Sequence, residues 1–137
     1  MLHLHSTLAI VLLLALVVSI IITLANLAGN KAYNRKIALI GLISAHLQLV
    51  VGLVLFFVLK YPSMMSGGIM KDPTLRFKII EHPLTMIIAI VLITIGYSKA
   101  KRITDAKKAN KTVAIFFILG LIFILARIPW STWSLFV

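Results

Sequence analysis

Five ionisable side chains stand in or beside long apolar stretches of this sequence, where charge is unusual. They are three histidines, His5, His46 and His82, together with Glu81, which directly precedes His82, and Arg127. An imidazole or a charge inside a membrane span is costly, and such residues usually bind or transfer something. These five residues are therefore the candidate functional residues.

Inward-facing histidines in an apolar helical bundle are typical of haem sites. Neutral imidazole is a good axial ligand of haem iron, and bundle cores commonly hold cofactors. Two such ligands must face each other at similar depth. Two pairs are conceivable, and both include His82: the second ligand is either His46, which is better buried, or His5, which is nearer to His82 in depth. Arg127 could pair with a haem propionate. The prediction is haem b, with iron bound by His82 and either His46 or His5.

Depth along the helices separates these residues. With 1.5 Å of rise per residue from the middle of each span, His82 lies about 9 Å and His5 about 18 Å toward one surface. His46 lies about 3 Å on the other side of the centre. His5 and His46 are thus expected to bracket His82 from above and below.

Polar neighbours accompany the histidines. Glu81 is the expected counter-ion of Arg127, because an unpaired charge in lipid is costly. Gln48 and Arg76 complete a predicted polar cluster with Glu81. Pro83 removes a backbone donor next to His82, which can loosen the turn that carries the imidazole.

The sequence lacks the residues that several other kinds of chemistry require. The chain has no cysteine, which excludes disulfides, thiolate metal sites and cysteine nucleophiles. No three- or four-ligand pattern for zinc or copper is present, and no Walker, Rossmann or nucleophile-elbow motif. The net charge of +11 comes from basic residues that flank apolar stretches, which indicates topology and anionic lipid rather than nucleic acid.

The elements that must position these residues are membrane-spanning helices. The 137 residues are 61% hydrophobic and only 12% charged, with a mean hydropathy of +1.11, far more apolar than a soluble domain. Four stretches, approximately 6–27, 37–59, 79–97 and 113–136, are long enough to cross a bilayer. The prediction is a single all-α integral membrane domain over 1–137, an antiparallel four-helix transmembrane bundle.

Loop composition predicts the ends and the orientation of the spans. Nine lysines and arginines lie in the first and third connections and four in the middle one, so the positive-inside rule places both termini and the middle loop outside. Asp72 followed by Pro73 is typical of a helix start, so the third helix is expected to begin near Thr74. The first span lacks a preceding basic segment and is long for a signal peptide, so it is expected to be a retained helix.

Four segments carry a resemblance to a known family: "LHLHSTLAIVLL", "AHLQLVVGLVLFF", "TLRFKIIEHPLTMIIAIVLITIGYSKAKR" and "AIFFILGLIFILARIPW". Together they resemble small four-span membrane proteins of Bacteroidota that are labelled "cytochrome B". The resemblance implies a haem-binding, electron-transfer protein of the bacterial inner membrane, with His5, His46 and His82 at the matching positions. The chain departs from the family where Pro83 directly follows Glu-His and where Leu8-Ala9 replaces a common basic residue.

Three hypotheses follow, and the sequence leaves open which holds and whether the protein is an enzyme. The first is the haem-binding bundle, with a redox partner or a quinone in the bilayer. The second is a non-catalytic accessory or assembly subunit without cofactor, whose polar groups set helix register. The third is a quinone or proton site formed by Glu81, His82 and Arg127 at the outer interface. Self-association into a homo-oligomer is compatible with each.

Overall fold

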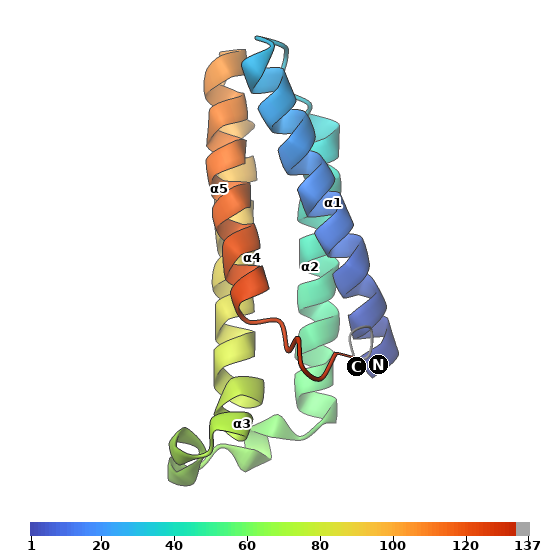
Figure 1. Ribbon diagram of the computed structural model, residues 1–137, viewed down its shortest axis with the longest axis vertical. Coiled ribbons are helices and arrows are strands. Elements are labelled where there is room, and N and C mark those ends of the chain that lie inside the picture. Colours follow the sequence, from blue (N-terminus) through green and yellow to red (C-terminus); the bar gives the residue numbers. More distant parts are fainter. Residues whose placement is uncertain (134–137) are drawn as a thin grey trace.

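The computed structural model describes residues 1–133, and throughout that range the regular structure is helical. The long helices are α1 (Leu2–Ala28), α2 (Arg35–Val58), α4 (His82–Ala100) and α5 (Ala106–Ala126) (Figure 1). Short helices η1 (Tyr61–Met64), η2 (Gly67–Lys71) and α3 (Pro73–Arg76) and the π-helical turn η3 (Phe77–Glu81) connect α2 to α4. The predicted all-α four-helix bundle of membrane type is confirmed.

Each of the four long helical segments is apolar enough to cross a membrane. Their most apolar windows have mean hydropathies of 3.2, 2.3, 2.0 and 2.2 in chain order, the third segment being Pro73–Ala100. Large apolar side chains cover the outside of the bundle, with Leu14, Ile21 and Phe57 each at least 60% exposed. An apolar exterior of this kind suits lipid rather than water.

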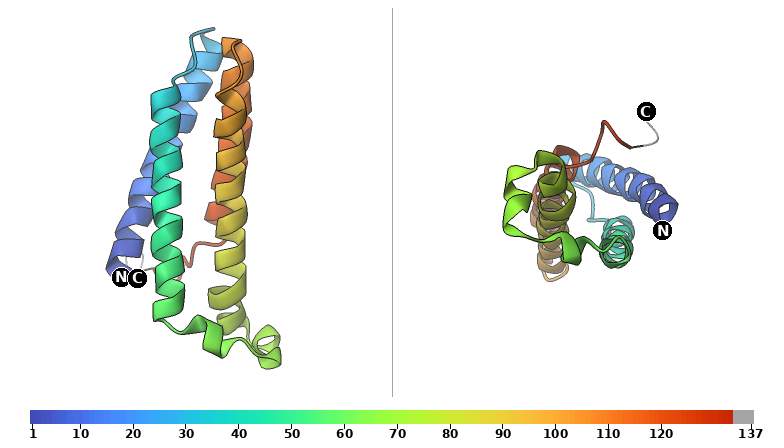
Figure 2. Two further views of the ribbon diagram at one scale, coloured as in Figure 1. Left: turned by 180° about the vertical axis from the view of Figure 1, so that it is seen from behind. Right: turned by 90° about the horizontal axis from the view of Figure 1, so that it is seen from below.

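The helices form a ring in which each packs against two neighbours. α1 packs mainly on α2 and α5, and α4 packs on the same two helices, so α1 and α4 are diagonal partners across the bundle (Figure 2). Along its length α1 is inclined to α4 and α5 (Figures 1 and 2). α1 lies close to α5 near residue 28 and diverges from α4 and α5 toward the N-terminus (Figures 1 and 2).

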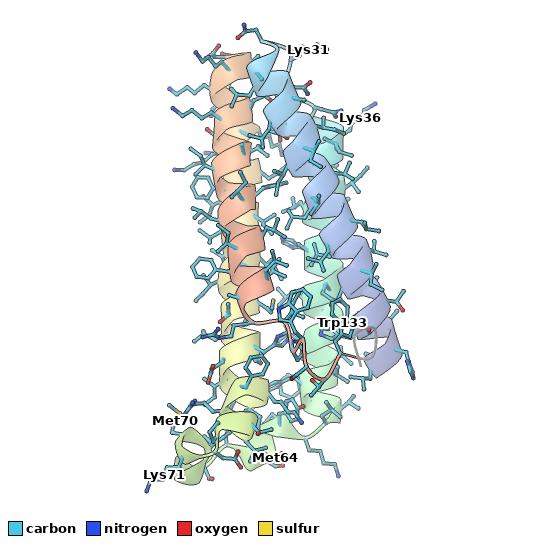
Figure 3. The ribbon with its side chains drawn as sticks, viewed as in Figure 1. Lys31, Lys36, Met64, Met70, Lys71 and Trp133 are labelled. Atoms are coloured by element: carbon cyan, nitrogen blue, oxygen red, sulfur yellow. The ribbon has the colours of Figure 1, made fainter. Side chains whose placement is uncertain are left out.

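The two ends of the bundle differ in composition. The basic end comprises the loops at residues 29–34 and 101–105 and the adjoining helix ends; Lys31 lies in the first loop and Lys36 at the start of α2 (Figure 3). The histidine end comprises the N-terminus, the connection at 59–72 and residues 127–133, and it carries Met64, Met70 and Lys71 (Figure 3). The N-terminus and the last described residues lie at this same end (Figure 1).

Capping side chains and prolines explain where the helices begin and end. Asp72 accepts backbone hydrogen bonds from Thr74 and Leu75, which confirms the expected start of the third helix. The predicted fourth span, 113–136, is wrong in its limits, because α5 begins at Ala106 and ends at Ala126. Pro129 has no N–H and disfavours helical backbone at the residue before it, so the helix stops early. Residues 134–136 of that prediction lie outside the described chain.

The turn before Pro83 is π-helical. The backbone N–H of His82 donates to the carbonyl of Phe77, five residues back, while Pro83 has no N–H to offer. A π-turn accommodates one extra residue, which rotates the preceding side chains by about 100° relative to a regular helix. The loosening expected from Pro83 is therefore present, and it sets the direction of the residues that lead into α4.

Candidate functional site

His5 and His82 meet at the histidine end from diagonal helices. Their ring centres are 6.2 Å apart and their planes are inclined by 82°. The expected difference in depth, about 9 Å, came from counting rise along each helix, and such a count does not fix the level of one helix relative to another. Of the two histidine pairs left open by the sequence, the structure brings together His82 and His5.

A backbone carbonyl holds the imidazole of His82 in one orientation. Nδ1 of His82 lies 2.7 Å from the carbonyl oxygen of Arg127. A carbonyl oxygen only accepts, so Nδ1 carries the hydrogen and donates it, and Nε2 keeps its lone pair. The ring of Phe77 stacks beside the imidazole, with centres 6.3 Å apart and planes inclined by 30°. This is the tautomer in which Nε2 can bind a metal.

His5 rests against a glycine of α2. A Cβ atom at Gly52 would lie only 3.3 Å from Cε1 of His5, so the glycine gives the imidazole its room. The side-chain amide of Gln48, one turn earlier on α2, donates to the carbonyl of His5 at 2.8 Å. Nδ1 of His5 is buried and has no hydrogen-bond partner within residues 1–133. α2 thus contacts the imidazole of His5 and holds its backbone, while Nδ1 stays without a hydrogen bond.

Glu81 lies between two arginines. Its carboxylate is 2.7 Å from Nε of Arg76 and 3.5 Å from Nε of Arg127. The ion pair expected with Arg127 is present, and the closer partner is Arg76, which also donates to the carbonyl of Met70 at 2.8 Å. One acid and two cations leave this group with a net positive charge next to His82 in the sequence.

Residues 127–133, which follow α5, run across the histidine end from α5 to α1 (Figure 1). Nε1 of Trp133 donates to the hydroxyl of Ser6 on α1, and Nε1 of Trp130 donates to the carbonyl of Leu125 at 3.0 Å. The same segment supplies the Arg127 carbonyl that orients His82. Sequence reasoning missed these contacts of the tryptophans, although Pro129 was a sign that the helix would end and free the segment.

His46 stands apart from the other candidates. It lies near the middle of α2, where its Nε2 is 2.9 Å from the hydroxyl oxygen of Thr94 on α4. The imidazole is exposed on the outside of the bundle, not enclosed at its centre as expected. The expectation mistook which face of α2 turns inward, because the small residues Ala38, Gly41 and Ala45 and the amide of Gln48 occupy the buried face.

The described residues thus bring two imidazoles together from opposite helices, with ring centres 6.2 Å apart. No group of three or more histidine, aspartate or glutamate side chains gathers as metal ligands anywhere in residues 1–133. No protein-family model, curated protein or solved structure matches this chain.

Proposed function

We propose that this protein is a b-type cytochrome-like membrane protein that binds one haem b between His5 and His82 and transfers electrons. The observation that carries the proposal is the distance of 6.2 Å between the two ring centres. An imidazole nitrogen lies about 2 Å from a bound metal, so two rings on opposite sides of one iron have centres about 6 Å apart. When bound, the haem would supply a one-electron redox couple.

The surroundings of each imidazole support this role. Metal-ligating histidines commonly donate their second ring N–H to a carbonyl, as His82 does to Arg127. On the other side, Gly52 leaves room for the ring of His5, and Gln48 holds its backbone. The chain residues therefore orient both ligands before a cofactor arrives, which lowers the entropy cost of binding.

Charge near the pair supports a haem rather than an uncharged ligand. Haem b carries two propionates, which favour guanidinium partners. Arg127 and Arg76 share the single carboxylate of Glu81, the residue before His82. One propionate could thus take up the excess positive charge of this group without displacing Glu81.

The proposed location is the bacterial inner membrane, with the basic end in the cytoplasm and both termini outside. Nine of the fourteen lysines and arginines lie at or near the basic end, which the positive-inside rule assigns to the cytoplasm. The haem would then lie near the outer surface, where a redox partner or a quinone in the bilayer could exchange electrons with it.

A visible spectrum tests the proposal. Protein purified in detergent from haem-replete cells should show a Soret band that shifts on reduction with dithionite. His82→Ala and His5→Ala should each lose that spectrum, whereas the matched variant His46→Ala should keep it. A colourless preparation, or a spectrum that depends on His46 and not on His5, would contradict the proposal.

The second candidate is the accessory subunit without cofactor. It is favoured by the way polar side chains already join the helices, with Gln48 bound to α1 and Trp133 bound to Ser6. For that function the purified protein should be colourless, and His82→Ala should lower the free energy of unfolding without any change in absorbance.

The outer-interface quinone site has less support from the contacts. The carboxylate of Glu81 is engaged by two arginines, and Nδ1 of His82 is engaged by a carbonyl. A headgroup at this position would have to displace one of these interactions before it could bind.

A further inference from the structure

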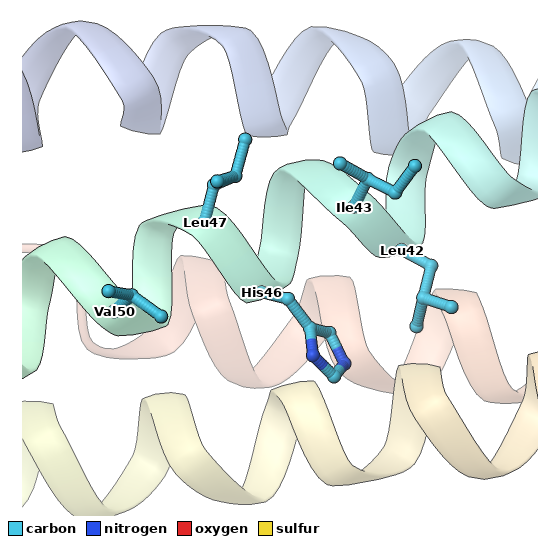
Figure 4. A pocket seen from close by; sticks show the side chains of 5 residues that line it. All are labelled: Leu42, Ile43, His46, Leu47 and Val50. Carbon is cyan, nitrogen blue, oxygen red and sulfur yellow. The ribbon is translucent and has the colours of Figure 1, made fainter.

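A shallow groove on the lipid-facing side of α2 has His46 as its one polar lining residue. Its other lining residues are Leu42, Ile43, Leu47 and Val50, and its volume is about 290 Å³. Figure 4 shows the imidazole leaving α2 toward α4 between Leu42 and Val50. The groove lies halfway along α2 and therefore near the middle of the bilayer.

The hydrogen bonds of Thr94 determine the tautomer of His46. The hydroxyl of Thr94 donates its one hydrogen to the carbonyl of Ile90 at 2.7 Å. Its oxygen therefore accepts from Nε2 of His46, at 2.9 Å. Nε2 carries the hydrogen, and Nδ1 is left with a lone pair that accepts no hydrogen bond from residues 1–133.

An unpaired acceptor is costly at this depth. No water is available in the hydrocarbon core to satisfy it, and a polar group left unpaired there is strongly disfavoured. Replacing His46 by an apolar residue would remove the cost, so the imidazole points to a donor that comes from outside the chain. That donor must reach the groove from the side, through lipid.

The position restricts what the donor can be. A phospholipid headgroup is charged and stays at the surface of the bilayer, so it does not reach the level of His46. The ligand must be neutral, soluble in hydrocarbon and equipped with an O–H or N–H group. A volume of about 290 Å³, at the lower limit for small-molecule sites, fits a single-ring headgroup.

We propose that this groove binds the headgroup of a membrane hydroquinone, with one phenolic O–H donating to Nδ1 of His46. The apolar side chains of Leu42 and Val50 would contact the ring, and the isoprenoid tail would remain in lipid. Thr94 acts as a positioning residue, because it holds the tautomer that accepts. This site is separate from the His5–His82 pair, and the proposal does not rest on haem binding.

Equilibrium dialysis of the full chain in detergent tests the site with a short-chain hydroquinone, kept reduced under anaerobic conditions, and with its dimethyl ether. The ether keeps the ring but has no O–H, so wild-type protein should bind the hydroquinone about three- to tenfold more tightly. His46→Ala should bind the two compounds equally. Ser44→Ala, on the same helix but outside the groove, should keep the wild-type preference.

Two results would overturn the proposal. One is equal binding of the hydroquinone and its ether by wild-type protein; the other is a preference that survives in His46→Ala. A dimer of wild-type protein that His46→Ala converts to a monomer, without any ligand preference, would assign the groove to a second copy of this chain instead. Thermal melting of both variants, followed by helical circular dichroism, confirms that each is folded in the assay.

Discussion

The two ends of the bundle differ in what their polar side chains contact. At the basic end Asn110 of α5 donates to the carbonyl of Lys31 in the loop at 3.0 Å, and Arg35 of α2 donates to the hydroxyl of Tyr97 on α4 at 3.1 Å. At the histidine end His5 and His82 face each other instead, and Nε2 of His82 keeps its lone pair. The basic end thus joins a loop and three helices through side chains, whereas at the histidine end an imidazole nitrogen, Nδ1 of His5, has no partner within residues 1–133.

The backbone of the helices also differs between the basic end and the histidine end. In the half nearer the basic end, α4 and α5 are regular and close together, since a Cβ atom at Gly96 would overlap Cβ of Phe116. At the histidine end the third segment contains a π-turn, and α5 ends at Ala126. π-turns are frequent at functional sites because they redirect side chains at a cost in helix stability. The comparison predicts that substitutions at the basic end act on stability and those at the histidine end on binding.

The largest stability effect is expected from Gly96→Ala. The added methyl group meets Cβ of Phe116, which is attached to the backbone of α5 and cannot rotate away, so the helices must separate. We expect a loss of about 2–3 kcal/mol in the free energy of unfolding, measured by SDS titration from mixed micelles. Gly67→Ala is the matched control, because a Cβ there has no neighbour within 4 Å. Equal effects of the two variants would show that α5 moves aside freely.

A smaller loss is expected from Asn110→Ala. Asn110 is fully buried, and its removal leaves the carbonyl of Lys31 without its donor. The cost should be about 1–2 kcal/mol in the same titration, while exposed Lys111, the next residue, should tolerate alanine. A neutral Asn110→Ala variant would mean that the loop at the basic end does not depend on this hydrogen bond.

The ion pairs of the histidine end should matter less for stability. Glu81→Gln leaves Arg76 and Arg127 to repel each other, but their side chains are 37% and 44% exposed, so solvent screens the repulsion. We expect a loss of about 1 kcal/mol at low ionic strength that shrinks as salt is added. Lys78→Gln serves as the control for a change in charge. A salt-independent loss would show that packing, and not charge, is responsible.

The effect that is smallest at neutral pH is a pH dependence at the basic end, which develops only in alkaline solution. Burial, reinforced by the nearby Tyr97, raises the pKa of Tyr33 to about 12, from an ordinary value of 10.0. Between these two values the unfolded chain releases the phenol proton and the folded chain retains it, so stability falls as pH rises from 10 to 12. Tyr33→Phe should reduce that fall in melting temperature and have little effect at neutral pH. Parallel curves for variant and wild type would assign the alkaline loss to other groups.

Local sequence was sufficient for some features of the site. Asp72 and Pro73 predicted a helix start, because capping depends on residue type. The opposite charges of Glu81 and Arg127 predicted their ion pair, because the two residues were expected at a similar level of the bundle. The limits of the fourth span were mistaken because apolar composition continues past Ala126, and Pro129 decides the helix end. The partner of His82 depended on the relative level of α1 and α4 and on the π-turn, neither of which has a periodic pattern in the sequence.

Composition alone determined that this protein is an apolar four-helix bundle with one basic end, because only helices satisfy the backbone in lipid and lysine and arginine cluster on one side. Tertiary structure decided which histidines meet. His5 and His82 approach each other across the bundle from α1 and α4, and His46 contacts Thr94 because small residues occupy the buried face of α2. Those outcomes depend on helix packing, to which residues distant in sequence contribute together.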